Sequence, residues 1–319
     1  MNGRLFAAVA LLAAAGIPAA LAQDKTIRLQ VPFAPGGGTD ILTRIIAPKL
    51  AERLGQPVIV ENRPGAGGAI AARYTAAAAP DGQTIMTGSI SEIAINPHIN
   101  PKIGYDVWKD FAFVGPVAYT PMMLVVHPAL PAKDLKELIA VAGAKPGALN
   151  YGSAGTGSGA HMGAELFRYL TKVDITHVPY KGVGPAVADT VAGQVQMTFT
   201  TVPSAVGFVR SGQLRALATA GAQRAPQLPD VPTFVESGVP EYLMDYWYCL
   251  VAPAATPKEM QARLNGALRE VMRMPDVAAS LDKSGLIPLS MTAEDFLAYV
   301  RKDSERWAAV VKAAGVKTE

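Results

Sequence analysis

Short apolar runs that favour β-strands alternate with helical patterns along most of this chain, and this alternation constrains the fold more than any other feature. Strand-like runs at 27–33, 57–63 and 83–89 enclose helical patterns at 39–54 and 68–78. A repeated strand, helix, strand order builds mainly parallel sheets, in which ligands are expected at the carboxyl ends of the strands. The pattern therefore predicts an α/β fold.

Pro48 interrupts the first of these helical patterns. A proline inside a helix removes one backbone hydrogen bond and crowds the preceding turn. We therefore expect either a kink at Pro48 or a break near Ala47.

The same alternation begins again near residue 122, which indicates a second unit of like design. It continues through strands expected at 122–128, 174–180, 195–201 and 246–253 and helices expected at 134–144, 160–170, 185–194, 258–272 and 293–314. If the tail returns to the first unit, the chain crosses between the units near 115–125 and again near 245–252, and two crossings make a hinge. The sequence thus predicts two lobes, with residues 23–120 and 250–319 in lobe 1 and residues 121–249 in lobe 2.

Residues 1–22 have the pattern of an export signal. Arg4 precedes an apolar run, and Ala20-Leu21-Ala22 forms an A-x-A cleavage site before the polar residue Gln23. We therefore expect a signal peptide over 1–22 and a mature chain outside the cytoplasm; an uncleaved membrane anchor is the alternative. Cys249 is the only cysteine in the chain, which excludes an internal disulfide and leaves a lipid-modified N-terminus without its attachment residue.

The charge balance argues against a nucleic-acid partner. The formal net charge is +3, from 29 Lys and Arg residues and 26 Asp and Glu residues, and Arg4 of the leader supplies one of the positive charges. Nucleic-acid-binding domains carry a clear basic excess. We therefore predict no nucleic-acid partner. A small anion is still compatible with this balance, because local dipoles rather than net charge would hold it.

Two glycine-rich segments each lie between an expected strand and an expected helix. The first is GGGTD at 36–40, and the second runs from Gly152 to Gly159 with hydroxyls at Ser153, Thr156 and Ser158. Glycines leave main-chain N–H groups uncovered, and the dipole of the following helix favours negative charge there. Both segments therefore fit a carboxylate cradle, and two facing cradles would form a clamp. A tight structural turn is the alternative for each.

Several signatures of catalysis, cofactors and metals are missing from the sequence. It has no G-x-G-x-x-G followed by an acidic residue, no G-x-S-x-G or H-E-x-x-H motif, and no cysteine pair. We therefore predict that the protein is not an enzyme and that it has no catalytic residue, no cofactor and no metal.

Three groups near the glycine segments and the expected hinge each allow two interpretations. His161 could donate a hydrogen bond to an anion or make a structural hydrogen bond, and its i, i+4 spacing from Glu165 is more typical of packing than of zinc binding. Asp40 fits a helix-start residue better than a general acid, because no partner is identifiable. The aromatic run at 246–248 fits hinge or core packing better than a stacking platform.

Long blocks of the sequence resemble the Bug or TctC-type receptors of tripartite tricarboxylate transporters. The resemblance covers nearly the whole mature chain, in order, through VPFAPGGGTDILTRIIAPKLAERLGQPVIVENRPGAGG, APDGQTI, AINP, LNYGSAGTGSGAHMGAELF, HVPYKGVGPAVADTVAGQVQ, VPSA, GQLRALA and LPDVPTFVESGVPEY. It implies a periplasmic, monomeric binding protein with two lobes of the type II kind and a hinge of two crossover strands. Such a receptor closes on a small carboxylate and delivers it to the membrane permease subunits.

In such receptors, main-chain N–H groups, hydroxyls and ordered waters of the two glycine loops hold the ligand carboxylate. Carried over to this sequence, the resemblance implies a lobe 1 site of Phe33, Ala34, Gly37, Gly38, Thr39, Asp40, Gly88 and Ser89. It implies a lobe 2 site of Ser153, Thr156, Gly157, Ser158, His161, Tyr180, Thr200 and Thr201.

The chain departs from the family's usual pattern at three places. Residues 89–93 read Ser-Ile-Ser-Glu-Ile where Asn-Thr-Gly-Thr-His is frequent, and residues 199–201 read Phe-Thr-Thr where Phe-Asp-Asn is frequent. Cys249 replaces a frequent glycine. An aspartate at position 200 could hold an ammonium group, so Thr200 favours a plain mono- or dicarboxylate, aromatic ones included, over an amino acid.

Two alternatives to a transport receptor stay open from the sequence. One is a secreted α/β hydrolase or isomerase with His161 as the base, although no activated nucleophile accompanies it. The other is a sensor subunit that presents a ligand to a membrane kinase.

Overall fold

The computed structural model describes residues 26–316, and the predicted signal peptide and its cleavage site lie outside this part of the chain. Its strands are β1 (Ile27–Val31), β2 (Val58–Asn62), β3 (Thr84–Ser89), β4 (Phe111–Val126), β5 (Asn150–Ser153), β6 (Thr176–Pro179), β7 (Met197–Thr201), β8 (Arg215–Thr219), β9 (Asp245–Pro253) and β10 (Ile287–Pro288). Its helices are α1 (Gly38–Leu54), α2 (Ala69–Ala76), α3 (Asn96–Ile99), α4 (Val107–Asp110), α5 (Leu135–Ala144), α6 (Gly159–Thr171), α7 (Val183–Val191), α8 (Val202–Arg210), α9 (Lys258–Val271), α10 (Pro275–Ser284) and α11 (Ala293–Ala314).

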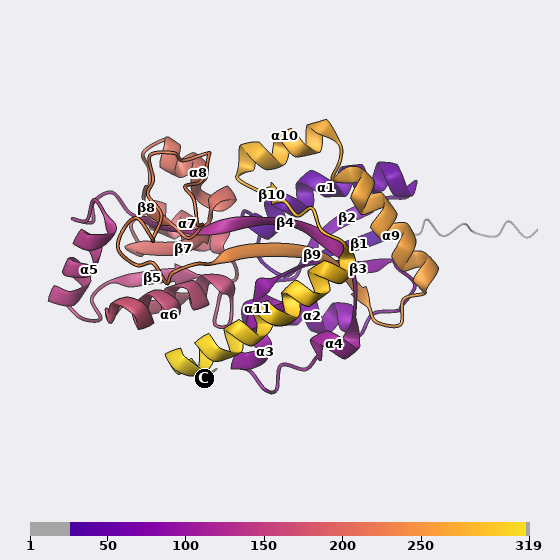
Figure 1. Ribbon diagram of the computed structural model, residues 1–319, viewed down its shortest axis with the longest axis horizontal. Coiled ribbons are helices and arrows are strands. Elements are labelled where there is room, and N and C mark those ends of the chain that lie inside the picture. Colours follow the sequence, from indigo (N-terminus) through magenta and orange to yellow (C-terminus); the bar gives the residue numbers. More distant parts are fainter. Residues whose placement is uncertain (1–25, 317–319) are drawn as a thin grey trace, which may run out of the picture.

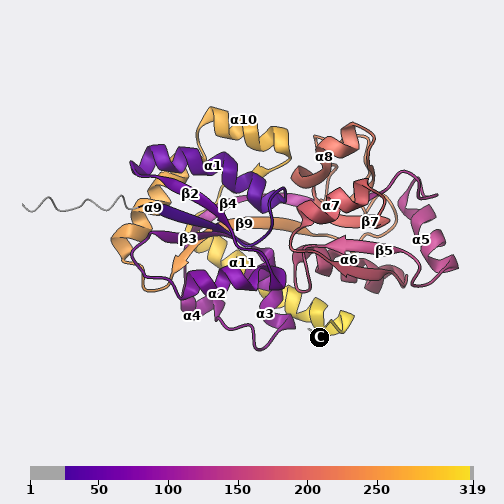
Figure 2. The same ribbon diagram turned by 180° about the vertical axis from the view of Figure 1, so that it is seen from behind.

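One sheet runs through the molecule in the order β2-β1-β3-β9-β4-β7-β5-β6, and β8 and β10 pair with β4 beside this path. Figures 1 and 2 show a lobe at each end of the long axis. We call the end that holds β1, β2 and β3 lobe 1, and the end that holds β5, β6 and β7 lobe 2. In each lobe the first strand pairs in parallel with two others, as the strand, helix, strand alternation predicts.

Buried apolar positions explain why the strands of lobe 1 form where they do. Ile27, Leu29 and Val31 of β1 have no exposed surface. Ile27 and Leu29 pack in one core with Leu42 and Ile46 of α1. Burial of such side chains supplies the main favourable free energy of folding, roughly 1.5 to 3 kcal/mol for each.

Strands β4 and β9 join the two lobes. From Phe111 to Pro121, β4 pairs antiparallel with β9, and from Met122 onward it pairs with β7 and β8 instead. The other edge of β9 pairs with β3 over Tyr248–Val251. Figure 1 shows both strands running side by side through the middle of the molecule. The change of partners at Met122 lies where the first crossing was predicted, between 115 and 125.

The predicted two-lobe α/β fold is confirmed. Helix α1 is continuous from Gly38 to Leu54, so the break expected near Ala47 is wrong, whereas a kink at Pro48 stays a prediction. Pro48 removes a single N–H donor from the helix, whereas Leu42, Ile46 and Leu50 on the same helix are buried in the core. That burial outweighs the loss of one hydrogen bond.

The C-terminal helix packs against both lobes. Helix α11 contacts the π-helical turn at Ser91–Ile95 and also α6, and it is anchored where Asp303 accepts a hydrogen bond of 2.8 Å from the Trp247 indole. Figure 1 shows it lying diagonally along one side of the sheet. Within residues 26–316, no helix combines the length and the apolar character that crossing a membrane requires.

Candidate binding site between the lobes

A small cavity lies between the lobes, at the carboxyl ends of the parallel strands. It encloses about 20 Å³ of free space, which is room for about one water molecule. Residues of both lobes and of the crossing strands surround it: Phe33, Gly37, Gly38, Thr39, Met122, Ala154, Ala160, Val183, Thr201, Tyr246 and Tyr248.

The lobes touch each other around this cavity, so the cleft is closed. The Ala34 N–H donates to Lys181 O at 2.9 Å, and the Gly159 N–H donates to Ser91 Oγ at 2.8 Å. A Cβ added at Gly67 would lie 2.5 Å from Thr156 O on the other lobe. Glycines thus allow the backbones of the two lobes to approach more closely than side chains would permit.

The first glycine loop brings the start of α1 to the cavity. Gly37 precedes the helix with extended backbone, at φ −82° and ψ 163°, and provides no side-chain cap. The first N–H groups of a helix have no intrahelical acceptor. Helices α7 and α8, which start beside Val183 and Thr201 of the cavity wall, also lack a side-chain cap hydrogen bond. Three uncapped helix starts, each with a positive dipole end, therefore adjoin one cavity.

Asp40 stabilises the first glycine loop through its side-chain carboxylate. It accepts hydrogen bonds from the Gly36 N–H at 3.1 Å and from Asn62 Nδ2 at 2.9 Å, and it forms an ion pair with Arg44 at 3.0 Å. Burial is the largest single influence and raises the pKa of Asp40, but the hydrogen bonds from Arg44, Asn62 and Gly36 together lower it below its ordinary value. Asp40 is thus an ionised carboxylate whose bonds are made within its own lobe.

The wall opposite α1 carries a polar atom without a partner. The Tyr248 hydroxyl is fully buried and faces Thr201, yet it makes no hydrogen bond of normal geometry with any described residue. A Cβ added at Gly38 would overlap this hydroxyl and would come within 2.6 Å of Thr201 Oγ1. A buried hydroxyl without a partner costs about 1 to 3 kcal/mol, so a ligand atom or a water is expected beside it.

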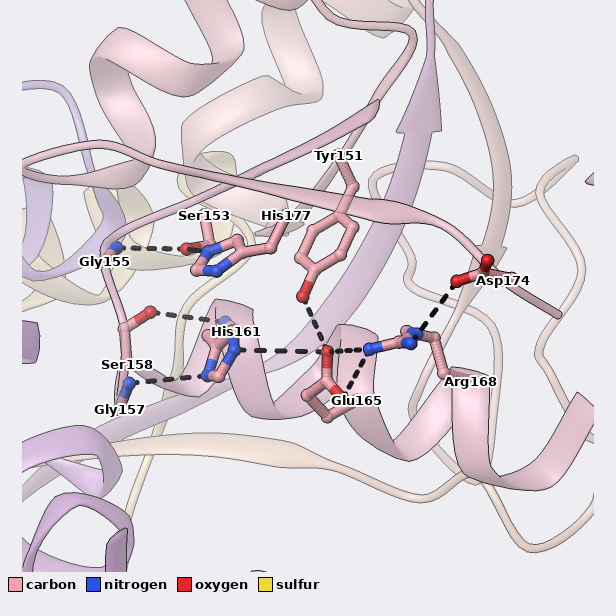
Figure 3. Close-up of polar contacts among 10 residues, drawn as sticks. All are labelled: Tyr151, Ser153, Gly155, Gly157, Ser158, His161, Glu165, Arg168, Asp174 and His177. Atoms are coloured by element: carbon pink, nitrogen blue, oxygen red, sulfur yellow. Dashed lines mark hydrogen bonds and ion pairs between the residues drawn. The ribbon is translucent and has the colours of Figure 1, made fainter. Parts of the chain in front are cut away.

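The second glycine loop is held by its own side chains, as Figure 3 shows. Ser158 caps α6, with its Oγ accepting from the His161 N–H at 3.2 Å. Ser153 Oγ accepts from the Gly155 N–H at 3.0 Å and lies 2.6 Å from His177 Nε2. The hydroxyls of Ser153 and Ser158 therefore make bonds that shape the loop.

Two histidines with tilted rings in contact lie behind this loop. The ring centroids of His161 and His177 are 4.3 Å apart, and His161 Nδ1 accepts a long hydrogen bond of 3.4 Å from the Gly157 N–H. Burial, with a smaller contribution from nearby positive charge, lowers the pKa of each to about 4. Both rings are neutral at pH 7, and the geometry around His161 is that of a structural hydrogen bond.

An ion-pair network continues from the histidines toward the surface (Figure 3). Glu165 accepts hydrogen bonds from the Tyr151 hydroxyl at 2.8 Å and from Arg168 at 3.0 Å, and it lies 4.0 Å from His161 Nε2. Arg168 also pairs with Asp174 at 3.5 Å. Within residues 26–316, no group of three or more His, Cys, Asp or Glu side chains is arranged to hold a metal ion.

The structure brings only some of the predicted site residues to the cavity wall. Those that line it are Phe33, Gly37, Gly38, Thr39 and Thr201. Ala34 and Thr156 lie at the contact between the lobes. The Tyr180 hydroxyl donates to Asp189 at 2.8 Å, and Thr200 is buried with no hydrogen-bond partner for its hydroxyl in the described part of the chain. The roles of all these residues in binding stay predictions.

Sequence reasoning missed the apolar and aromatic part of the wall. Met122, Ala154, Ala160 and Val183 carry no chemical signal in a sequence, and the aromatic run at 246–248 was assigned to packing. In β9 the alternate residues Tyr246 and Tyr248 point to one face, toward the cavity, and Trp247 points away to α11. The expected strand at 246–253 already implied that the side chains of residues 246 and 248 point to one face and that of residue 247 to the other.

A family model described as "Tripartite tricarboxylate transporter family receptor" matches residues 42–316. Protein BugT of Bordetella pertussis is 37% identical over 320 residues, which cover 98% of this chain and 98% of that protein. MatC of Rhodopseudomonas palustris, solved with bound malate, is 36% identical with a TM-score of 0.87 over 90% of this chain and 98% of that one. A second R. palustris protein, solved with adipate, is 36% identical with a TM-score of 0.88 over 92% of this chain and 98% of that one.

Proposed function

Since this chain belongs to the tripartite tricarboxylate transporter receptor family, and is therefore a solute-binding receptor and not an enzyme, we propose that it captures a small mono- or dicarboxylate between its lobes. The family resemblance expected from the sequence blocks is confirmed, and the hydrolase or isomerase alternative is set aside. The ligand has no ammonium group and can be aliphatic or aromatic.

One observation carries this proposal: a buried hydroxyl that has no partner among residues 26–316 faces a small cavity that adjoins three uncapped helix starts. The groups are the Tyr248 hydroxyl and the starts of α1, α7 and α8. A carboxylate supplies the acceptor oxygens and the negative charge that such a set of donors and dipoles lacks. The malate and adipate bound by two relatives are carboxylates of this size class.

The proposal includes a hinge motion. About 20 Å³ of free space is less than even a small dicarboxylate occupies, so the lobes must separate to admit the ligand and close on it with some rearrangement of the wall. We place the hinge in β4 and β9 and keep the lobe bounds near residues 120 and 250.

The biological role follows from the family. We propose that residues 1–22 are removed on export and that the mature receptor works as a periplasmic monomer. It delivers its ligand to the membrane permease subunits of a tripartite tricarboxylate-type transporter. Presentation of the ligand to a sensor kinase is the alternative, which a pull-down with the permease subunits would test.

A thermal-shift panel tests the proposed ligand class. A ligand present at 100 times its Kd stabilises a protein by about 2.7 kcal/mol, which gives a clear rise in melting temperature. Within a panel of mono- and dicarboxylates, amino acids, sugars and neutral amides, we expect the carboxylates to give the largest shifts. A panel in which only amino acids or sugars stabilise the protein would contradict the proposal.

A further inference from the structure

A buried acid lies behind the cavity, in the segment where this chain departs from the usual family pattern. Glu92 belongs to the single π-helical turn Ser91–Ile95 that follows β3, and it has no exposed surface. π-turns of this kind are rare and frequently occur at functional sites. Within residues 26–316, no Lys, Arg or His side chain forms an ion pair with Glu92.

A chain of hydroxyl groups connects Glu92 to the cleft. Glu92 Oε2 lies 2.9 Å from Ser89 Oγ, which lies 2.9 Å from the Tyr246 hydroxyl, and that hydroxyl lies 2.6 Å from Ser91 Oγ. The Tyr246 side chain lines the cavity. At its far end the chain of hydroxyl groups reaches lobe 2, because Ser91 Oγ accepts a hydrogen bond from the Gly159 N–H at the start of α6.

The titratable side chains that interact with Glu92 are all neutral near pH 7. They are Tyr105, whose hydroxyl donates to Glu92 O at 2.6 Å, and Tyr246, Tyr248 and Cys249 of β9. Gly68, the residue before α2, also lies close to the Glu92 carboxyl. Helices α3 and α11 also pack against the π-turn, but within residues 26–316 no charged group on them shifts the pKa of Glu92. Burial raises the pKa of Glu92 to about 8 against the hydrogen bonds that it accepts. An ionised carboxylate here would be a buried charge without a counter-charge, so the acid form prevails at neutral pH.

The protonation state of Glu92 fixes the direction of the hydroxyl chain. When Glu92 is ionised, Ser89 must donate to it, Tyr246 to Ser89 and Ser91 to Tyr246, so every hydroxyl proton is used. When Glu92 carries its proton on Oε2, the acid can donate to Ser89, and each donation along the hydroxyl chain then reverses. Ser91 Oγ then accepts from both Tyr246 and Gly159, and its own proton becomes a free donor at the contact between the lobes.

We propose that Glu92 is a positioning residue that links carboxylate capture to a proton: the receptor binds its anionic ligand with Glu92 in the acid form and loses affinity when Glu92 ionises. This inference rests on the proposed function, because it assumes an anion in the cleft. Two effects act together. Ionisation removes the free donor on Ser91, and it places a buried negative charge one hydroxyl chain away from the ligand carboxylate.

The test measures the dissociation constant by calorimetry between pH 6.5 and pH 9.5, with L-malate, adipate and the strongest carboxylate of the thermal-shift panel as probes. For one linked proton and the pKa given above, wild type should bind about tenfold more weakly at pH 9 than at pH 7. In Glu92→Gln the amide keeps the shape, donates to Ser89 Oγ and cannot ionise, so the ratio of the two constants should be close to one.

Asp303→Asn is the matched control. Asp303 of α11 is another buried carboxylate, but it bonds Trp247 and Arg306 and does not line the cavity. This variant should keep the tenfold ratio of wild type. A further measurement needs no variant: titrations of wild type at pH 8 in buffers of different ionisation enthalpy should show uptake of about half a proton per ligand bound.

The outcomes separate this inference from the proposed function. Carboxylate binding with a flat pH profile and no proton uptake would refute the role of Glu92 and leave the proposed function intact. A tenfold ratio that persists in Glu92→Gln would equally overturn it. Failure of every carboxylate to bind at any pH would refute the proposed function, and this inference with it.

Discussion

Replacing Gly184 by alanine should block closure of the lobes without harming the fold of either lobe. Gly184 lies in the first turn of α7 in lobe 2, and an added Cβ would overlap Pro35 O and lie 3.2 Å from Gly36 Cα in lobe 1. Both contacts are with backbone, which cannot rotate away as a side chain can. Gly184 does not have a positive φ, so alanine fits the helix itself.

The magnitude follows from the cost of overpacking. Forcing one extra carbon into a close-packed contact costs typically about 1 to 3 kcal/mol. Because the overlap exists only when the lobes meet, this cost opposes the closed, ligand-bound form. The dissociation constant should therefore rise by about 5- to 150-fold. Calorimetric titration with the carboxylate that wild type binds measures this change, and thermal melting without ligand measures any change in the fold.

Gly143→Ala provides the control. Gly143 lies in α5, and a Cβ there meets no atom within 4 Å, so the variant should keep wild-type affinity and gain about 0.5 to 1 kcal/mol of stability. Unchanged ligand affinity in Gly184→Ala would refute the reasoning. So would a loss of ligand-free stability as large as the loss of binding free energy, because the damage would then not be specific to closure.

Three further predictions concern Thr200, Glu92 and the N-terminus. Thr200→Asp should weaken binding of the native acid by on the order of 1 to 3 kcal/mol and weaken binding of an amino acid of matched size less. Titration of wild type and variant with both ligands measures the two losses, and equal losses would show that Thr200 does not set specificity. Burial raises the pKa of Glu92 in the folded protein to about 8. Glu92 therefore contributes its full stabilisation at a pH below the ordinary pKa of a glutamate, and this stabilisation is lost as the pH rises toward 8. Glu92→Gln should therefore be more stable than wild type at pH 7 by on the order of 3 kcal/mol and gain much less at pH 4, and equal melting temperatures at pH 7 would contradict this. N-terminal sequencing of the exported protein should begin at Gln23, and a sequence that begins at Met1 would show that cleavage after Ala22 does not occur.

The sequence predicted the elements whose patterns are local and missed those that depend on distant partners. Helix α11 was expected at 293–314 and runs from Ala293 to Ala314, because its apolar period is complete within the segment. Strand β4 was expected only from residue 122 but begins at Phe111. Its first half contains Gly115 and Pro116, which argue against a strand locally, yet pairing with β9 holds it extended.

The glycine loops show how far site prediction could go. Glycine spacing placed both loops at helix starts, and the structure brings both to the contact between the lobes. The sequence did not reveal which glycine needs a positive φ. Gly36 has φ +86°, whereas Gly37 has φ −82°, so an alanine at Gly37 would be limited by Val183 at 3.2 Å and not by backbone strain.

The polar groups behind the loops were not predictable from the sequence. His177 meets Ser153 and His161 only because β6 pairs with β5 in a particular register. Ser89 and Ser91, which connect Glu92 to the cavity, meet Tyr246 across 157 and 155 positions of the chain, and nothing near them in the sequence indicates a partner so far away. Such networks depend on the tertiary fold, whereas glycine loops and helix starts are encoded locally.

The proposed function requires that a carboxylate, recognised by its charge, is held in the cleft between the lobes. Calorimetric titration of the mature protein with the strongest carboxylate of the panel and with the primary amide of the same acid tests this requirement. The two ligands match in size and shape, but the amide lacks the charge that uncapped helix starts favour. We predict saturable binding of one acid per chain and binding of the amide that is weaker by about 100-fold. Equal affinities for acid and amide, or no binding of any carboxylate, would refute capture of a carboxylate through its charge.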